Sequence, residues 1–353
     1  MARRRKDVPA LASHGAEALP HVMVDDYNVV LTEGDEHVGD RASGRAFRQI
    51  LDDLRAGLRK NGDDPLGDAP SRDFSKKMLD KVLAEGEPAA AGLVHGAVEH
   101  FAQELAAVLG RFLKRKEWKG TERVAIGGGL RDSRVGELAI GRASVILKGE
   151  GHAIELAPIH HHPDEAGLIG AAYLAPSWIF SGHDAILAAD IGGSNLRAGL
   201  VSLNLKKAAD FSAASVAASE QWRYREAKPS REEVVAKLIE MLRGLIGKAG
   251  KAKLHLAPFI GLACPGVVNA DGSLADGTQN LPGNWESSRF NLPALLKEEI
   301  PTIDDNPIAV IMHNDAVVQG LSEVPYMQDV RHWAVLTIGT GLGNARFTNN
   351  DQA

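Results

Sequence analysis

The chain has 353 residues, enough for about two domains at roughly 150 residues each. Its 40 Lys and Arg stand against 46 Asp and Glu, and the net charge of −6 excludes a global electrostatic pull toward nucleic acid or an anionic membrane. The single cysteine, Cys264, excludes an intrachain disulfide framework and a thiolate zinc cage. No run of about 18 apolar residues is present, and no apolar segment follows the basic start at residues 1–6, so we expect a cytoplasmic protein without a membrane span.

The first half of the chain mixes β-rich, helical and turn signals. Residues 21–31 predict a hairpin with its turn at 26–28, because β-formers flank Asp and Asn there. Further along, the patterns predict a helix over 46–60, a polar loop over 61–70, a helix over 89–115 with Pro88 in its first turn, and a buried strand over 123–126.

The second half alternates strands and helices. We expect a helix from residue 164, capped by Asp164 and running through Tyr173, in which Gly167 and Gly170 allow close packing. The other expected elements are strands over 185–189, 200–202, 259–263, 308–312 and 333–338, and a helix over 232–246. This alternation predicts an α/β fold.

Several of these strands end in glycine or acidic residues, where ligands of α/β proteins gather. After the strand 185–189 comes Asp190-Ile-Gly-Gly-Ser-Asn-Leu-Arg197. Gly192 and Gly193 permit a tight turn whose amides can approach an anion, and Ser194 and Asn195 add neutral donors. A carboxylate beside a phosphate requires a cation between them, which makes Asp190 a candidate ligand of Mg²⁺ through water. The alternative is a plain hairpin turn.

A second glycine loop follows the strand 333–338. Gly339, Thr340 and Gly341 form a candidate anion cradle, for which the alternative is a structural turn. Two separate loops of this kind suit one polyphosphate. The chain has no Gly-x-x-x-x-Gly-Lys-Ser/Thr motif, and the loop Gly127–Gly129 does not match a dinucleotide fingerprint.

The third candidate site is Asn314-Asp315, directly after the apolar strand 308–312. An aspartate at a strand end near a phosphate site can act as a general base toward a hydroxyl group. Phosphoryl transfer otherwise needs mainly positioning and charge neutralisation. The alternative is that Asp315 caps a helix over 316–322.

With these residues the sequence resembles the ROK family (repressor, open reading frame, kinase) of bacterial sugar kinases, which have a two-lobed ribonuclease H-like/actin-like ATPase fold. The segment from Asp190 resembles the family's phosphate-1 motif, and Leu336–Gly343 resembles phosphate-2. Pro265-Gly-Val-Val with Gln279-Asn-Leu-Pro-Gly-Asn-Trp285 resembles its sugar-side loop, and Asn314-Asp315 its catalytic pair.

The order of the motifs differs from the family. The segments that resemble its second half come first here: residues 16–24 (Glu-x-Gly-His region), 41–47 (Ala-Ser-Gly helix start), 124–131 (adenosine-side strand and loop) and 165–173 (last helix). We interpret the chain as a circular permutant, with the family's usual ends joined near 176–183 and new ends after 347 and before about 13. Such a change is tolerated when the ends lie close together at the surface.

The resemblance implies ATP-dependent phosphorylation of a hexose-like sugar, with ATP and Mg²⁺ as cofactors and Asp315 as the base. The implied sugar-side residues are Gly266, Asn280, Asn314, Asp315, His21, Glu17 and Asp40, and the implied ATP-side residues are Gly192–Asn195, Gly339–Gly341 and Gly127–Gly129. The glutamate lies four residues before His21 rather than three, and the family's zinc cysteines are absent, so no zinc site is expected. The identity of the sugar stays open.

We expect a small lobe over 166–318 and a large lobe made of 1–165 and 319–353. The expected partners are a sugar and a nucleotide, with no nucleic acid and no membrane. A homodimer stays open, because members of the family often form dimers.

The alternatives are a degenerate protein that binds without turnover, a kinase that uses another phosphoryl donor such as polyphosphate, and a sugar-sensing repressor, for which residues 1–45 offer no helix-turn-helix pattern. His160–His162 are interpreted as an exposed loop with a metal site as the alternative, Trp285 as a packing residue and Arg197 as a brace of its hairpin.

Overall fold

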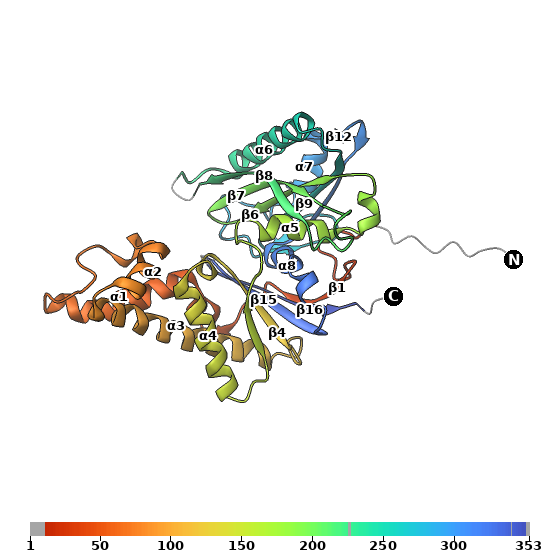
Figure 1. Ribbon diagram of the computed structural model, residues 1–353. Coiled ribbons are helices and arrows are strands. Elements are labelled where there is room, and N and C mark those ends of the chain that lie inside the picture. Colours follow the sequence, from red (N-terminus) through yellow and green to blue (C-terminus); the bar gives the residue numbers. More distant parts are fainter. Residues whose placement is uncertain (1–10, 225–226, 340, 351–353) are drawn as a thin grey trace. The chain divides into compact units, whose positions relative to one another are not determined.

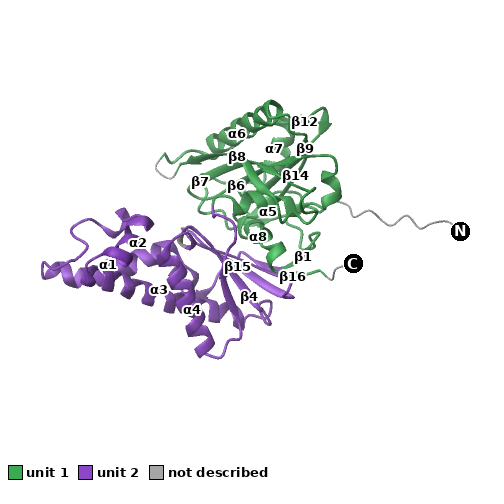
Figure 2. Ribbon diagram, viewed as in Figure 1, with its two compact units in different colours: residues 1–24, 164–328, 348–353 green, residues 25–163, 329–347 purple. Residues whose placement is uncertain are grey.

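Figure 1 presents the computed structural model of the protein, which describes residues 11–224, 227–339 and 341–350. The chain forms two compact units (Figure 2). Unit 1 consists of Met1–Val24, Asp164–Gln328 and Thr348–Ala353, and unit 2 consists of Asp25–Pro163 and Asp329–Phe347. Each unit has its own sheet and its own hydrophobic core.

The boundaries of the units differ from the two lobes expected from the sequence. The segment 166–318 lies entirely in unit 1, but residues 319–328 and both described chain ends group with it as well. Hydrogen bonds explain the grouping of the ends. The Gly15 amide donates to the Met312 carbonyl at 3.0 Å, and the Asn350 amide donates to the His21 carbonyl at 3.1 Å.

The sheet of unit 1 has five strands in the order β14-β9-β6-β7-β8. Its strands are β6 (Ala185–Ile191), β7 (Asn195–Ser202), β8 (Ser215–Arg223), β9 (Leu256–Cys264) and β14 (Ala309–Asn314). The strands β14, β9 and β6 are parallel, whereas β6, β7 and β8 are antiparallel neighbours. When the five strands are numbered by their order in the chain and the sheet is read from β8 to β14, the order is third, second, first, fourth, fifth, in agreement with the ribonuclease H-like fold that the resemblance implies.

Helices cover both faces of this sheet, as Figure 1 shows. The helices are α5 (Ala166–Gly170), α6 (Arg231–Lys251), α7 (Leu292–Glu299) and α8 (Asp315–Leu321), with 3₁₀ turns at Ala171–Leu174, Ser177–Phe180 and Val324–Tyr326. All seven residues of β6 are buried, as expected for a central strand covered on both faces. Leu187 and Ala189 belong to the core shared with α6 and α7, while Asp190 faces α5 at Gly167.

The expected helix over 164–173 is shorter than predicted and does not begin with Asp164 as its cap. Only Ala166–Gly170 is α-helical, and Glu165 precedes it without a side-chain cap. Asp164 is held elsewhere, because its carboxylate accepts a hydrogen bond from Arg197. The predicted close packing is confirmed at Gly170, where a Cβ atom would lie 1.8 Å from the carbonyl oxygen of Val318 in α8.

The sheet of unit 2 has the order β1-β16-β15-β4-β5. Its strands are β1 (Val22–Tyr27), β4 (Arg123–Gly128), β5 (Glu155–Pro158), β15 (His332–Ile338) and β16 (Leu342–Asn349). The strands β15, β4 and β5 are parallel. If the strands are numbered from β15 as first and β16 as second, and then β1, β4 and β5 as third to fifth, the sheet read from β1 to β5 has the same order: third, second, first, fourth, fifth.

The helices of unit 2 are α1 (Gly44–Lys60), α2 (Lys76–Glu85), α3 (Pro88–Lys114) and α4 (Arg134–Gly149), with 3₁₀ turns at Val38–Ala42, Ser71–Asp73 and Gly129–Arg131. The helix expected over 89–115 is confirmed as α3. Its apolar stripe, which includes Phe101, Leu105 and Phe112, forms the centre of the core. The expected helix over 46–60 is confirmed as α1, which Ser43 caps by accepting a hydrogen bond from the Ala46 amide.

The hairpin predicted over 21–31 is wrong. The strand β1 is the neighbour of β16 in the sheet, and the Asn28 amide donates to the Asn344 carbonyl at 3.0 Å. The β-rich residues do form a strand, but its partner is more than 300 positions away in the sequence, so no local pattern predicts the pairing. Two-stranded sheets form instead between β2 (Thr32–Glu33) and β3 (Glu36–His37), β10 (Val267–Val268) and β11 (Leu274–Asp276), and β12 (Thr302–Ile303) and β13 (Asn306–Pro307).

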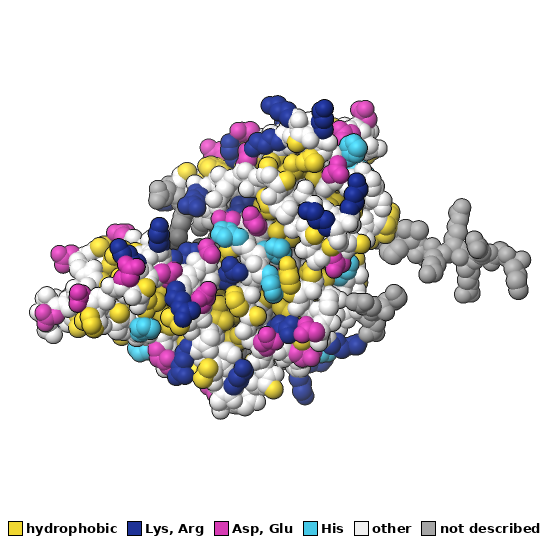
Figure 3. Space-filling view, in the orientation of Figure 1, with side chains coloured by type: hydrophobic (Ala, Val, Ile, Leu, Met, Phe, Trp, Pro, Cys, Tyr) yellow, Lys and Arg dark blue, Asp and Glu magenta, His cyan; other side chains and the backbone are white. Residues whose placement is uncertain are grey.

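Within the described residues, none of the helices combines the length and the apolar character needed to cross a membrane. Basic and acidic side chains are interspersed on the face drawn in Figure 3, in keeping with the small net charge of −6.

Candidate functional site

The carboxyl ends of three parallel strands bring the principal candidate residues of unit 1 together. Asp190 of β6 is paired in register with Ala263 of β9, and Asn314 at the end of β14 is paired with Cys264. Because β9 lies between β6 and β14, the backbones of Asp190 and Asp315 are about two strand spacings apart, roughly 10 Å. The two candidate carboxylates therefore lie at one edge of one sheet.

Asp315 has the electrostatic properties of a base that works near neutral pH. Burial, and secondly the Asp190 carboxylate, raise the pKa of Asp315 to about 7. Its Oδ1 atom accepts a hydrogen bond from the Ala316 amide at 2.9 Å, which fixes the orientation of the carboxyl group. Between the two acids, burial raises the pKa of the Cys264 thiol well above its usual value, so this thiol stays protonated and is no nucleophile.

Asp190 is only 3 % exposed, and Arg197 partly compensates its charge. The Arg197 Nη1 atom donates to Asp190 Oδ2 at 3.2 Å across the β6–β7 pair, and its Nη2 atom donates to Asp164. Burial raises the pKa of Asp190, while Arg197 opposes that rise. The prediction that Arg197 braces the hairpin is confirmed, and this cation also accounts for a carboxylate in front of a glycine turn.

The acidic edge fits a Mg²⁺ ion that is held mainly by phosphate and water. In the described part of the chain, no three His, Cys, Asp or Glu side chains are grouped as a metal site would require. Mg²⁺ is commonly bound through one or two carboxylates together with substrate phosphates and waters, and Asp190 can supply the carboxylate. A divalent cation there would also offset the repulsion between Asp190 and Asp315 that raises the pKa of Asp315.

The glycine turn after β6 lies directly against the loop that resembles the family's sugar-side segment. The Gly192 amide donates to the Asn195 carbonyl at 2.9 Å, which closes the turn around Ser194. A Cβ atom on Gly193 would lie 2.7 Å from the Asn280 carbonyl oxygen, so only glycine permits this approach. Two motifs nearly 90 residues apart are thereby brought into contact.

Both polar atoms of the Asn314 side chain make hydrogen bonds within the protein. Its Oδ1 atom accepts from the Ala316 and Val317 amides at 2.9 and 3.3 Å, and its Nδ2 atom donates to the Gly266 carbonyl at 3.0 Å. The side chain is 1 % exposed. Asn314, not Asp315, is therefore the cap of α8, and it holds the predicted sugar-side Gly266 in place.

His313 supports this arrangement and was not identified from the sequence. Its Nδ1 atom accepts from the Asn314 amide at 2.7 Å, so Nε2 carries the proton and donates to the Ala16 carbonyl at 3.2 Å. Burial lowers the pKa of His313 to about 4, which keeps the ring neutral. The apolar strand before it gave no hint of this role, because the role depends on the contact with residue 16.

The predicted sugar residues near the N-terminus of unit 1 have other surroundings. His21 packs edge-on against Tyr173 and Phe211, with ring centroids 5.6 and 6.4 Å away. Burial lowers the pKa of His21. Glu17 is exposed, and its carbonyl oxygen accepts from the Val24 amide at 2.7 Å.

In unit 2, two predicted glycine loops lie at the ends of neighbouring parallel strands. Ile338 of β15 is paired in register with Gly128 of β4. Gly339 therefore follows the end of β15, and Gly127 and Gly128 are the last two residues of the adjacent strand β4. A Cβ atom on Gly128 would lie 2.3 Å from the Ile338 carbonyl oxygen. The start of α1 contacts the second of these loops in chain order, because the Gly44 amide donates to the Gly339 carbonyl at 3.0 Å.

The predicted residues Asp40, Gly129 and Gly341 also belong to unit 2. Asp40 is exposed, and its Oδ1 atom lies 4.0 Å from the position a Cβ atom on Gly341 would take. The carbonyl oxygen of Gly129 accepts from Lys76 Nζ at 2.6 Å. Thr340 lies outside the described residues.

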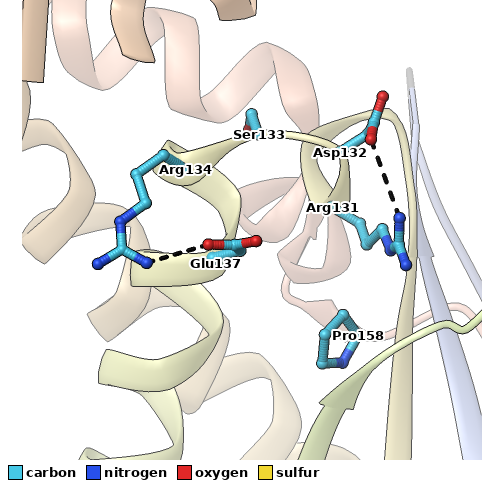
Figure 4. Close-up of a pocket in the computed structure, with 6 residues that line it drawn as sticks. All are labelled: Arg131, Asp132, Ser133, Arg134, Glu137 and Pro158. Carbon is cyan, nitrogen blue, oxygen red and sulfur yellow. Dashed lines mark hydrogen bonds and ion pairs between the residues drawn. The ribbon is translucent and has the colours of Figure 1, made fainter. Parts of the chain in front are cut away.

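A pocket of about 350 Å³ lies beyond the Gly127–Gly129 loop (Figure 4). Its lining contains both charge signs, with an Arg131–Asp132 pair at 3.9 Å and an Arg134–Glu137 pair at 3.0 Å. Nearby, His162 Nε2 lies 3.3 Å from Asp132 Oδ2, and the segment from His160 to His162 forms a loop as expected.

Trp285 is confirmed as a packing residue, since it is fully buried against Phe290.

Comparisons with known proteins add little to these observations. No protein-family description matches the chain, and no curated protein matches it. Among solved structures, it is similar to a proposed N-acetylmannosamine kinase of Listeria monocytogenes, with 20% identity, 48% of this chain and 49% of that chain covered and a TM-score of 0.33.

Two further solved structures are similar at the same level. One is a ROK hexokinase of Thermus thermophilus, with 21% identity, 47% of this chain and 48% of that chain covered and a TM-score of 0.35. The other is an exopolyphosphatase-like protein, with 14% identity, 70% and 86% of the two chains covered and a TM-score of 0.33. The match spans about half the length of each of the two kinases. We therefore base the function on the residues of the site.

Proposed function

We propose that the protein is an ATP-dependent sugar kinase that phosphorylates a hexose or hexose-like sugar, with Asp315 as the general base. The observation that carries the proposal is the pair of carboxylates, Asp190 and Asp315, at the ends of parallel strands beside a glycine turn, with the pKa of Asp315 raised to about 7. A carboxyl group with this pKa is about half ionised at neutral pH and can accept a hydroxyl proton.

In the proposed reaction a sugar oxygen forms a bond to the terminal phosphorus while the bond to the departing ADP oxygen breaks. Asp315 takes the proton of the sugar hydroxyl. Mg²⁺, when bound at Asp190, supplies positive charge that neutralises the phosphate oxygens. The Gly192–Asn195 turn supplies amide and side-chain donors to the phosphates. Asn314 holds Gly266 by a hydrogen bond and caps the helix that begins at Asp315. His313 in turn accepts a hydrogen bond from the Asn314 amide.

The remaining assignments follow the resemblance. Gly339–Gly341 would hold phosphates and Gly127–Gly129 would lie under adenosine, an assignment supported by the position of Gly339 and Gly128 at the ends of adjacent parallel strands in unit 2. Gly266 and Asn280 would face the sugar. His21, Glu17 and Asp40 stay proposals as sugar ligands, and the contacts described above favour His21 and Glu17 less than Asn280, which touches the phosphate turn directly.

The test is a coupled assay of ADP release over a panel of neutral hexoses, N-acyl hexosamines and charged sugars, with and without Mg²⁺. We expect turnover with at least one sugar, and loss of turnover when EDTA removes the metal. A parallel panel replaces ATP with polyphosphate. Sugar binding by calorimetry without turnover on any donor would contradict the kinase assignment and favour a degenerate binding protein.

We also propose that the chain is a circular permutant of the family's fold. The support is topological: the sheet of unit 2 repeats the strand order of unit 1 only if β16 is followed by β1. The two segments meet where a connection would run, because the Asn350 amide donates to the His21 carbonyl and the Asn350 side chain donates to the Leu19 carbonyl at 2.9 Å.

This proposal predicts that the chain tolerates relocated ends. A variant that begins at residue 183, joins residue 350 to residue 11 through a flexible glycine-rich linker, and ends at residue 182 should keep the fold, because Ser181 and Gly182 are exposed and Gly182 has a φ of 83° in a surface turn. We expect wild-type circular dichroism and a cooperative melt. A control opened at residue 260 within the buried strand β9 should fail to fold. Equal failure of both variants would contradict the permutation.

A further inference from the structure

A second pocket, also of about 350 Å³, lies in unit 1 beside the Gly192–Asn195 turn. Its walls come from three segments that are distant in the sequence. The lining residues are Gly193, Tyr224, Lys228, Pro229, Asn280, Leu281, Pro282 and Gly283. The pocket therefore borders both the proposed phosphate turn and the proposed sugar-side loop.

The walls of this pocket are tied to the turn. The Tyr224 hydroxyl donates to the Gly192 carbonyl, and the Tyr224 amide donates to the Ser194 carbonyl at 3.1 Å. On the other side, the backbone of Asn280 is in contact with Gly193. A ligand in the pocket would thus lie against groups that also shape the phosphate turn.

The charge of the pocket is unbalanced. Among the described residues that line it, Lys228 is the one with a full charge, and none carries a carboxylate. Its ammonium group is exposed and, within the described residues, takes part in no ion pair. The pocket in unit 2 differs, since its two arginines are matched by Asp132 and Glu137. A cation without a counter-charge beside a concave surface attracts an anion.

Lys228, which lines this pocket, has an unusual backbone conformation. Its φ is 43°, in the left-handed region where residues other than glycine and asparagine are uncommon. The amides of Ala227 and Lys228 both donate to the Tyr224 carbonyl, at 3.0 and 3.2 Å, and Pro229 follows.

We propose that this pocket binds an anionic group of a substrate, a phosphate or a carboxylate, with Lys228 as its ion-pair partner and the Asn280 side chain as a neutral donor. The inference deepens the proposed function and rests on it only in calling the ligand a substrate. Two sources of the group share this chemistry. One is a charged acceptor, namely a sugar acid or a sugar phosphate, and the other is the phosphate chain of the donor.

The experiment measures binding of defined probes to the full chain by isothermal titration calorimetry at low salt. The probes are glucose, glucuronate, glucose 6-phosphate and tripolyphosphate. The variants are Lys228→Met and, as a matched control, Lys253→Met, an exposed lysine that has a φ of 55° but does not line the pocket.

We expect the wild-type chain to bind at least one charged probe, and Lys228→Met to weaken that binding about tenfold, as the loss of one ion pair in a concave site implies. Lys253→Met should bind it like the wild type. Loss confined to glucuronate and glucose 6-phosphate identifies a charged acceptor, and loss confined to tripolyphosphate identifies the donor chain.

Three results would overturn the inference: no charged probe binds the wild type, Lys228→Met binds them all unchanged, or Lys253→Met loses as much. The readout is independent of turnover. Binding that depends on Lys228 in a protein without any ADP release would refute the proposed function alone. ADP release in a protein whose anion binding does not involve Lys228 would refute the inference alone.

Discussion

Replacement of Asp315 by asparagine is expected to lower turnover by roughly 10²–10⁴, because asparagine keeps the shape of the side chain but cannot accept the hydroxyl proton. The acceptor bond from the Ala316 amide survives in this variant, so the start of α8 should be undisturbed. The measurement is kcat in the coupled ADP-release assay with the best sugar found. Turnover at the wild-type level would remove the assignment of Asp315 as base.

The same substitution, which lowers turnover, is expected to increase the stability of the fold, and the size of this increase depends on pH. The pKa of Asp315 is raised from 3.8 to about 7, so the folded state prefers the protonated acid and loses stability as the pH rises between these values. Asp315→Asn removes this penalty. We expect the variant to be more stable than the wild type by roughly 1–3 kcal/mol at pH 8, allowing for partial exposure, and by less at pH 5.

Unfolding by urea in EDTA, without substrates, measures this difference at the two pH values. Asp305→Asn is the control, since Asp305 lies in an exposed turn with a φ of 62°, which asparagine adopts readily. The control should change neither kcat nor the pH dependence of stability. A variant at position 315 that is less stable than the wild type at pH 8 would indicate a mainly structural carboxylate. In the active enzyme, kcat/KM should rise with pH up to about 7.

Replacement of Arg55 by methionine is expected to lower the free energy of unfolding by about 3–5 kcal/mol, because it leaves buried polar groups without partners. Arg55 is 0 % exposed. Its guanidinium donates to Asp64, Ser71, and the Gly67 and Ala69 carbonyls at 2.7–2.9 Å, and lies 4.7 Å above the Phe74 ring. It joins α1 to the loop expected over 61–70.

Arg59→Met is the matched control, because Arg59 donates to the same Asp64 oxygen at 3.0 Å but its side chain is 36 % exposed. This variant should lose about 1 kcal/mol or less. The buried Trp118 and Trp333 report unfolding of unit 2 by fluorescence. If Arg55→Met is too unstable to purify, proteolysis of the two variants in cell lysate gives the ranking. Equal stability of both variants would contradict the role of Arg55.

The parts of the structure that the sequence predicted well have strong local signals. The strands β6 and β15 are apolar runs closed by Asp190 or glycine, and α3 repeats its apolar residues at helical spacing over 27 residues. Such patterns describe burial and turn geometry within a short window. They place Asp190 and Asp315 at strand ends, but they do not specify which strands are neighbours.

The parts that were missed depend on contacts between distant residues. The sequence predicts a hairpin partner for β1, whose neighbour in the sheet is β16, and it gives no clear signal for α2 and α4. It also predicts a helix cap at Asp164, whose carboxylate instead pairs with Arg197. Asn314 stays a prediction as a sugar-side residue, and its side chain also caps α8 and donates to the Gly266 carbonyl. No window of a few residues contains these partners, so propensity alone could not reveal them.

The repeated strand order carries one more consequence. In each sheet the glycine turn follows the strand that stands third in space, β6 in unit 1 and β15 in unit 2, so the two turns occupy equivalent positions in two copies of one architecture. Duplication of an ancestral gene of about half the length would produce this correspondence.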